Sequence, residues 1–142
     1  MGFLFKPLIY CWVLPYTLLG VTVSIVSRLS GGGGHFHGGV WEAWGGWPGR
    51  LMKLGLPFAG PVAAITLGHV VIGANKQAVH DTRTHERAHV KQYEWWGPLF
   101  LLAYLLASLW VWIKSRDPYR DNPFEVAARS AKAEKLSRQS DV

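Results

Sequence analysis

The chain has 142 residues, of which 49% are hydrophobic and only 17% are charged. An ordinary soluble domain carries about 25% charged residues, so this composition indicates one membrane-associated domain. The net charge is +6, but the Lys and Arg residues are scattered between apolar runs. That distribution favours a lipid bilayer as the partner and argues against nucleic acid. The single cysteine, Cys11, excludes both a disulfide framework and a cysteine-based zinc site.

The first apolar run covers residues 3–27 and contains one charge, Lys6. A helix rises about 1.5 Å per residue, so this run is long enough to cross a bilayer core of about 30 Å. We therefore predict that residues 1–28 form a transmembrane anchor. A cleaved signal peptide is the alternative, although the run is long and its basic start is thin for one.

A Gly-rich linker is predicted for residues 29–39, because six of the nine residues in 31–39 are glycine. So much glycine disfavours both a helix and the interior of a strand. His35 and His37 lie in this segment and are available to a metal ion. A hinge after the anchor is the favoured interpretation of the segment.

Two short runs predict strands. Residues 40–44 alternate weakly between apolar and polar, and residues 62–73 are rich in β-branched side chains. The segments 45–50 and 56–61 between them are typical of turns, so we expect a small antiparallel sheet or hairpin. His69 lies inside the second run and is expected to be a packed or solvent-facing residue rather than a metal ligand.

The stretch RTHERAHVKQYEWW, residues 83–96, predicts a helix that contains His-Glu-x-x-His. Residues four apart share a helix face, so His85 and His89 can direct ring nitrogens at one cation. Zinc accepts neutral imidazole. Glu86 lies about 100° around the helix, where a carboxylate can move a proton to and from water beside the ion. The predicted N-cap of this helix is one of Asp81, Thr82 and Thr84.

A third ligand is expected from the polar helix that begins at Asn122-Pro123. Glu125 lies 36 residues after His89, and small residues follow it, which allows close helix packing. The alternative is that Glu125 only caps its own helix, since Asn122 and Glu125 have capping-box spacing. Glu94 is the fallback ligand if Glu125 lies elsewhere.

Two stretches resemble a known family, the zincin metallopeptidases of the gluzincin type. THERAHVKQYEWWGPLFLLAYLLAS and YRDNPFEVAA are also similar to a group of small bacterial membrane proteins, and the likeness spans roughly residues 60–130. The resemblance implies that His85, His89 and Glu125 bind zinc and that Glu86 is the general base. It also implies that an edge strand within 62–73 holds an extended substrate. The chain departs from better-known membrane gluzincins at Arg129, where an Asp commonly follows the ligand Glu.

The uncharged segment 97–113 is at the short limit for crossing a bilayer, about 17–25 residues. A straight crossing would separate the His pair from Glu125 by about 25 Å, whereas zinc–oxygen bonds are about 2.0–2.2 Å. We therefore predict that the chain reverses after the motif helix and brings Glu125 to His85 and His89.

These patterns predict an α+β fold in which a small sheet packs on the motif helix and the apolar helix after it, behind a transmembrane anchor. The predicted zincin-like domain covers residues 40–130, and 131–142 form a polar tail. The expected function is a zinc peptidase of the bacterial inner membrane that acts on a protein or peptide through Glu86. The alternative is a non-catalytic integral membrane protein whose motif helix is structural or only binds metal.

Overall fold

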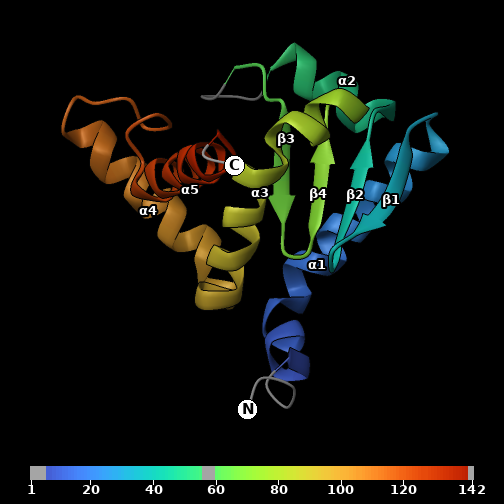
Figure 1. The fold of residues 1–142 in the computed structure, drawn as a ribbon, viewed down its shortest axis with the longest axis horizontal. Coiled ribbons are helices and arrows are strands. Elements are labelled where there is room, and N and C mark those ends of the chain that lie inside the picture. Colours follow the sequence, from blue (N-terminus) through green and yellow to red (C-terminus); the bar gives the residue numbers. More distant parts are fainter. Residues whose placement is uncertain (1–5, 56–59, 141–142) are drawn as a thin grey trace.

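The structure is a computed structural model, and it describes residues 6–55 and 60–140 (Figure 1). The fold is α+β, as the sequence predicts. The elements follow in the order α1 (Lys6–Leu29), β1 (Gly33–His37), β2 (Val40–Trp44), α2 (Gly46–Leu54), β3 (Ala64–Leu67), β4 (Val70–Gly73), α3 (Lys76–Trp96), η1 (Gly97–Leu99), α4 (Phe100–Ile113) and α5 (Pro123–Ser140).

The four strands form one mixed sheet in the order β1-β2-β4-β3. The hairpins β1–β2 and β3–β4 are antiparallel, and the central strands β2 and β4 are parallel. The prediction of an antiparallel sheet is therefore wrong at its centre. The cause is α2, which lies where turns were expected and carries the chain past one strand position to β3. The β3–β4 hairpin then places β4 beside β2 and parallel to it. Gly49 allows α2 to pack closely against the end of β4. A Cβ at this position would lie 2.6 Å from the carbonyl oxygen of Ala74, the residue that follows β4.

Strand β1 occupies a segment that was predicted to be a flexible linker, and that prediction is wrong for Gly33–His37. The glycines make room for two tryptophan side chains of the neighbouring strand. A Cβ at Gly33 would lie 2.8 Å from the Trp44 ring, and one at Gly34 would lie 2.9 Å from the Trp41 ring. The strand is held by its backbone pairing with β2 and by this aromatic cover.

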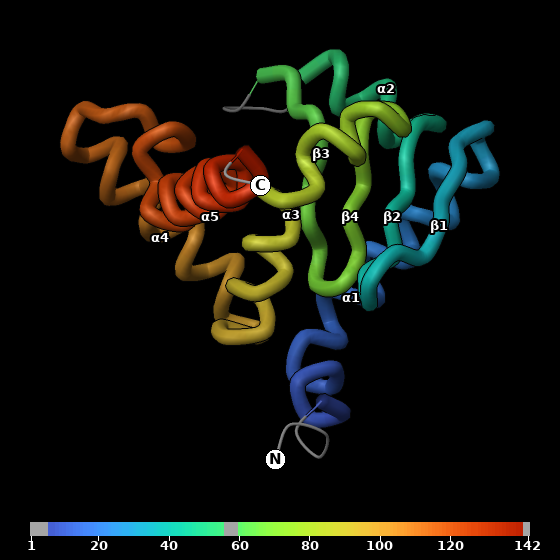
Figure 2. Tube along the Cα trace, in the orientation of Figure 1, coloured from blue at the N-terminus to red at the C-terminus, as the bar shows by residue number. Residues whose placement is uncertain are grey.

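The sheet lies between α1 on one face and α3 on the other (Figures 1 and 2). Val70 and Ile72 of β4 point toward α1 and α2, and Val71 points toward Val90 of α3. Small residues of α1 contact the sheet directly, and Gly20 is one of them. A Cβ there would lie 2.6 Å from the Val70 Cβ.

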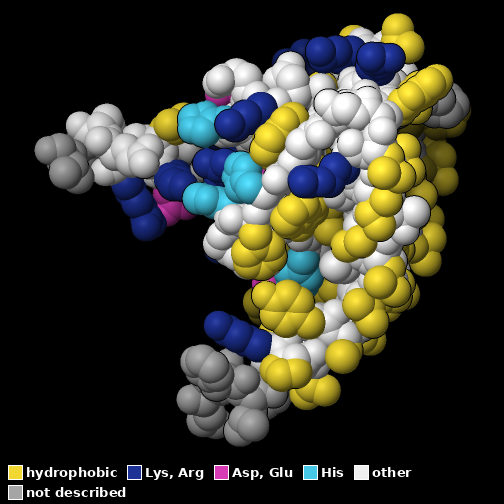
Figure 3. Space-filling view, turned by 90° about the vertical axis from the view of Figure 1, so that its right-hand side faces the viewer, with side chains coloured by type: hydrophobic (Ala, Val, Ile, Leu, Met, Phe, Trp, Pro, Cys, Tyr) yellow, Lys and Arg dark blue, Asp and Glu magenta, His cyan; other side chains and the backbone are white. Residues whose placement is uncertain are grey.

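The outer face of α1 is apolar and exposed. By length and composition, α1 and the helical stretch Lys76–Ile113, which comprises α3, η1 and α4, are each apolar enough to cross a membrane. In the second stretch the longest run without a charged side chain is residues 95–113. Hydrophobic side chains form a band along one edge of the molecule in Figure 3. On α1 the exposed ones include Leu8, Trp12, Leu14, Leu18, Leu19 and Ile25.

The motif helix α3 begins earlier than predicted. Its N-cap is Asn75, whose side-chain oxygen accepts a hydrogen bond from the Ala78 amide at 2.8 Å. The predicted caps at 81–84 therefore lie inside the helix. The predicted end is confirmed, because Gly97 at φ +53° stops α3 next to the Trp12 ring.

The chain reverses twice after the motif helix, as the third-ligand argument predicts. Helix α4 leaves the end of α3, and α5 returns to lie against α3 (Figures 1 and 2). An aromatic cluster joins the three helices: the Phe100 ring lies 4.3 Å from the Tyr93 ring and 5.3 Å from the Phe124 ring, between centroids. This packing positions the first turn of α5 beside the histidines of α3.

Candidate metal centre

Helices α3 and α5 bring together the three residues that the sequence predicts as metal ligands. The Nε2 atoms of His85 and His89 lie 3.1 Å apart. His85 Nε2 lies 3.2 Å from Glu125 Oε2, and His89 Nε2 lies 3.3 Å from Glu125 Oε1. One ligand atom from each residue lies within 4.8 Å of the other two, so the group is close enough to hold a metal ion.

The spacing of these atoms matches the edge of a small coordination tetrahedron. With metal–ligand bonds of about 2.0–2.2 Å, neighbouring ligand atoms of a tetrahedral zinc site lie about 3.3–3.6 Å apart. The separations of 3.1, 3.2 and 3.3 Å lie at or slightly below the lower end of that range. Glu125 Oε2 is also buried, and its contact with His85 Nε2 has ion-pair distance without the geometry of a hydrogen bond. A cation would satisfy this oxygen, so the donor set fits a metal.

Asn122 fixes the start of α5 and thereby the position of Glu125. Its side-chain oxygen accepts a hydrogen bond from the Phe124 amide at 2.9 Å, and its amide group donates to the Tyr104 carbonyl at 3.1 Å and to Ser108 Oγ at 2.7 Å. The Glu125 carboxylate faces the histidines and bonds no backbone group of its own helix end in the described residues. The alternative that Glu125 is only a cap is therefore wrong.

Two side chains, Gln92 and Tyr104, orient the ligands through hydrogen bonds. Gln92 lies 2.8 Å from His89 Nδ1 through its Oε1 atom, and its amide group donates to the Phe124 carbonyl at 3.0 Å. The Tyr104 hydroxyl donates to Glu125 Oε1 at 2.9 Å. Metal-binding histidines usually donate their second N–H to such an acceptor, which fixes the ring. Sequence reasoning missed both residues, although Gln92 is three positions after His89 and so shares its helix face.

Glu86 lies beside the ligands but points to the sheet side of α3. It is only 4% exposed, and its Oε2 atom accepts a hydrogen bond from the Thr66 hydroxyl of β3 at 2.8 Å. Thr66 was not singled out from the sequence, because nothing local to it signals the contact with α3. Together, Thr66 and the helix hold the carboxylate next to the His pair.

Burial and mutual interaction shift the pKa values in this cluster. Burial raises the pKa of Glu86 above its ordinary value. Burial also opposes charge on His89 and Glu125, but their contacts with each other outweigh it. The pKa of His89 is raised, and the pKa of Glu125 is well below its usual range because both histidines lie close to its carboxylate.

The remaining candidate ligands have other partners. Glu94, the fallback ligand, lies 3.0 Å from His69 Nε2 through its Oε1 atom. His69 is buried in the β3–β4 turn, and its ring packs on Tyr10 with centroids 4.4 Å apart. His35 lies 3.1 Å from the buried Glu42. These contacts link α1, the sheet and α3, and none of the three joins the His85–His89–Glu125 group.

In comparisons with known proteins, no family model, no curated protein and no solved structure matches the chain. The geometry of the site therefore carries the functional argument by itself.

Proposed function

We propose that the chain is a membrane-associated zinc metallopeptidase in which His85, His89 and Glu125 bind the ion. The observation that carries this proposal is the close approach of the three side chains. The two histidine Nε2 atoms lie 3.1 Å apart, and each lies 3.2 or 3.3 Å from one of the two Glu125 oxygens. Two imidazoles and a carboxylate are a ligand set typical of catalytic zinc, and three protein ligands leave one coordination position open. Bound zinc acidifies water and polarises a carbonyl group.

Glu86 is the proposed general base. Its carboxylate adjoins the His pair, and Thr66 fixes one of its oxygens, so the other is available to accept a proton from water. The same carboxyl group then returns the proton to the leaving amine. Burial disfavours its ionised form, and a raised pKa is what a group that accepts and returns a proton near neutral pH requires.

Strand β3 is the proposed binding edge for an extended peptide. It ends the sheet, since β4 is its only strand neighbour in the described structure. Thr66, which holds Glu86, lies in this strand. A peptide that added to β3 through backbone hydrogen bonds would therefore run close to the general base, as strand addition allows.

Membrane attachment is proposed through the exposed face of α1 and through residues 95–113. Both are apolar and poorly covered by the rest of the chain. The catalytic groups lie on α3 before residue 95 and at the start of α5, so they are outside these apolar segments. A bacterial inner membrane is the proposed location.

One observation favours the second candidate, a protein that binds metal for structural reasons. The ligands are largely covered: His89 is 7% exposed and Glu125 is 3% exposed. Structural zinc sites are closed, whereas catalytic ones keep a position open to water. In this alternative Glu86 is a buried partner of Thr66 with no chemical role.

Metal analysis and a peptidase assay on the same purified variants separate the two functions. The proposal expects one zinc per chain in the wild type and in Glu86→Gln, and loss of zinc in His89→Ala and Glu125→Gln. It expects peptide hydrolysis only in the wild type, with a loss of about 10²–10⁴ in rate in Glu86→Gln. Zinc retained without any hydrolysis by the wild type supports the structural role, and absence of zinc from the wild type contradicts both.

A further inference from the structure

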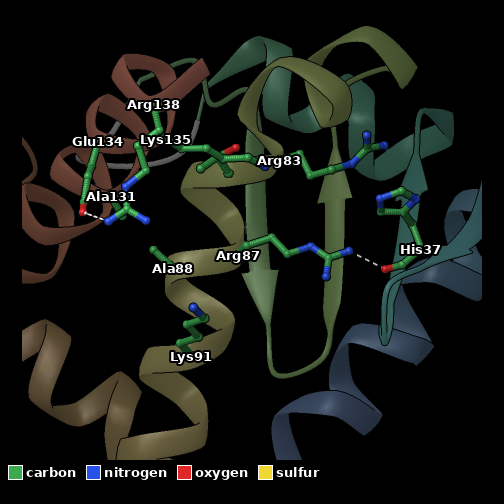
Figure 4. A pocket seen from close by; sticks show the side chains of 10 residues that line it. His37, Arg83, Arg87, Ala88, Lys91, Ala131, Glu134, Lys135 and Arg138 are labelled. Atoms are coloured by element: carbon green, nitrogen blue, oxygen red, sulfur yellow. Dashed lines mark hydrogen bonds and ion pairs between the residues drawn. The ribbon is translucent and has the colours of Figure 1, made fainter. Parts of the chain in front are cut away.

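A basic groove crosses the solvent-facing side of α3, between the β1–β2 hairpin and α5 (Figure 4). Its volume is about 510 Å³, within the range of about 300–1,000 Å³ typical of ligand pockets. Five cationic side chains and one acid line it: Arg83, Arg87, Lys91, Lys135, Arg138 and Glu134. In Figure 3 the Lys, Arg and His side chains gather in a hollow, on the side away from the hydrophobic band.

The cations of this basic groove differ in how they are held. Arg83 makes two hydrogen bonds of 2.8 Å to the Glu42 carboxylate, and Arg87 donates to the Gly38 carbonyl at 2.7 Å. These contacts fix two guanidinium groups along one wall. Lys91 and Lys135 are exposed and make no hydrogen bond or ion pair with any described residue. The groove therefore combines two fixed guanidinium groups, whose charge Glu42 partly offsets, with two free ammonium groups and the Arg138–Glu134 pair.

The shape and lining of the basic groove limit what can occupy it. A flat bilayer surface cannot enter a hollow between two helices, whereas a single extended chain can. No Phe, Tyr or Trp is among the described residues that line it, so it lacks the stacking platform that single-stranded nucleic acid requires. Ala88 and Ala131 leave the space between α3 and α5 open. These features suit a short chain that carries carboxylates.

We propose that the basic groove binds an acidic segment of a polypeptide partner. Carboxylates of the segment pair with Lys91 and Lys135 and meet the remaining N–H groups of the fixed arginines. The residues that line the groove include none of His85, His89 and Glu125, so the groove is separate from the candidate metal centre. Binding of an acidic segment therefore does not require the peptidase function. It identifies an acidic polypeptide as a partner, which the metal centre alone does not.

Fluorescence anisotropy with the full chain in neutral detergent tests this proposal. The probe is a labelled peptide of about eight residues with alternating Glu and Ala, which spans about 26 Å when extended. Its matched comparison has Lys in place of Glu. The groove variant is Lys91→Glu with Lys135→Glu. The control variant is Lys53→Glu with Lys114→Glu, which changes the net charge equally at the ends of α2 and α4.

The proposal expects the acidic peptide to bind the wild type, the control variant and Glu86→Gln with the same Kd, within about twofold. It expects the groove variant to bind at least tenfold more weakly, and the Lys peptide not to bind. Binding should weaken with added salt, because the Debye length falls from about 10 Å at 0.1 M to about 3 Å at 1 M. Equal weakening in both double variants overturns the proposal, as does displacement of the peptide by glycerol phosphate at equal charge, which would indicate phosphate recognition.

Discussion

The Tyr104 hydroxyl donates a hydrogen bond of 2.9 Å to Glu125 Oε1, and this bond joins α4 to the carboxylate of the metal centre. Removing it leaves the carboxylate free to rotate away from the His pair. We expect Tyr104→Phe to weaken zinc binding by about 10–100-fold, as is typical for partners of metal ligands. Competition with a zinc chelator measures the change. Tyr10→Phe, on α1, is the control, and an equal loss in both variants would contradict the assignment.

Gln92 is expected to fix the ring of His89. An Nδ1–H donated to Gln92 Oε1 leaves the Nε2 lone pair directed at the ion. Gln92→Leu should therefore lose about 10–100-fold in zinc affinity. Gln92→Glu keeps the acceptor but loses the donor to the Phe124 carbonyl, so it should retain most of the affinity. If both variants lose zinc equally, the hydrogen bond from Gln92 to the Phe124 carbonyl of α5 contributes more to zinc affinity than the contact with the His89 ring.

Gly20→Ala tests the close contact between α1 and the sheet. Alanine in an exposed helix stabilises it by about 1 kcal/mol relative to glycine. Here the added Cβ would lie 2.6 Å from the Val70 Cβ and 2.9 Å from the Leu67 carbonyl oxygen, so the free energy of unfolding should fall instead. Denaturant unfolding followed by circular dichroism gives the sign. Thr22→Ala, exposed on the same helix, should not destabilise the chain.

The Glu42–Arg83 pair predicts a loss of stability in acid. Burial opposes charge on Glu42, but the hydrogen bond and charge of Arg83 outweigh it and lower the pKa of Glu42 below 4.5. The unfolded chain has the ordinary value, so the pair stabilises the fold above pH 4.5 and this contribution is lost as pH falls through the lowered pKa. Unfolding measured against pH should show this decline.

Two variants separate the Glu42–Arg83 pair from other acids. Glu42→Gln should flatten the decline and cost about 1.5–3 kcal/mol at neutral pH, the range for hydrogen bonds to charged groups. Glu134→Gln breaks an exposed pair with Arg138 and should cost less than about 1 kcal/mol. An unchanged acid profile in Glu42→Gln would assign the decline to other carboxyl groups.

Membrane attachment through α1 predicts that the chain remains in the membrane fraction after a carbonate wash. Asp in place of Leu18 should release part of the protein, since a charged residue in an inserted helix costs about 2.5–3.5 kcal/mol. Leu54→Asp is the control, because Leu54 is exposed at the end of α2, outside the apolar helices. Equal release of both variants would contradict insertion of this face of α1.

The candidate metal centre was predictable from local chemistry. Helical spacing places His85 and His89 together. Because metal–ligand bonds are short, Glu125 can be a ligand only if the chain reverses and brings it beside the two histidines. Both expectations are confirmed as geometry. The orienting groups were harder to predict. Tyr104 reaches Glu125 only because α4 turns back, and Thr66 reaches Glu86 only because β3 lies against α3.

The sheet was less predictable than the site. Glycine-rich segments have no alternation of apolar and polar side chains, so the sequence of β1 does not indicate a strand. The side chains that cover β1 are Trp41 and Trp44, which belong to the next strand. The run 62–73 has no turn signal except Gly68, which at φ +62° divides it into β3 and β4. Helix α2 contains two glycines and Pro48, which mimic a turn in sequence.

The ligands of the candidate metal centre are far apart in the chain, and this separation makes a bound ion a cross-link. An ion held by His89 and Glu125 closes a loop of 36 residues, from position 89 to 125, that includes all of α4. Closing a loop of this length in an unfolded chain costs about 3–4 kcal/mol in lost entropy when the link is covalent. Part of the ion's binding energy therefore serves to hold the helical hairpin of α4 and α5 in place. The contact between Glu125 and the ion thus completes the site and also limits how far this hairpin can move relative to the sheet.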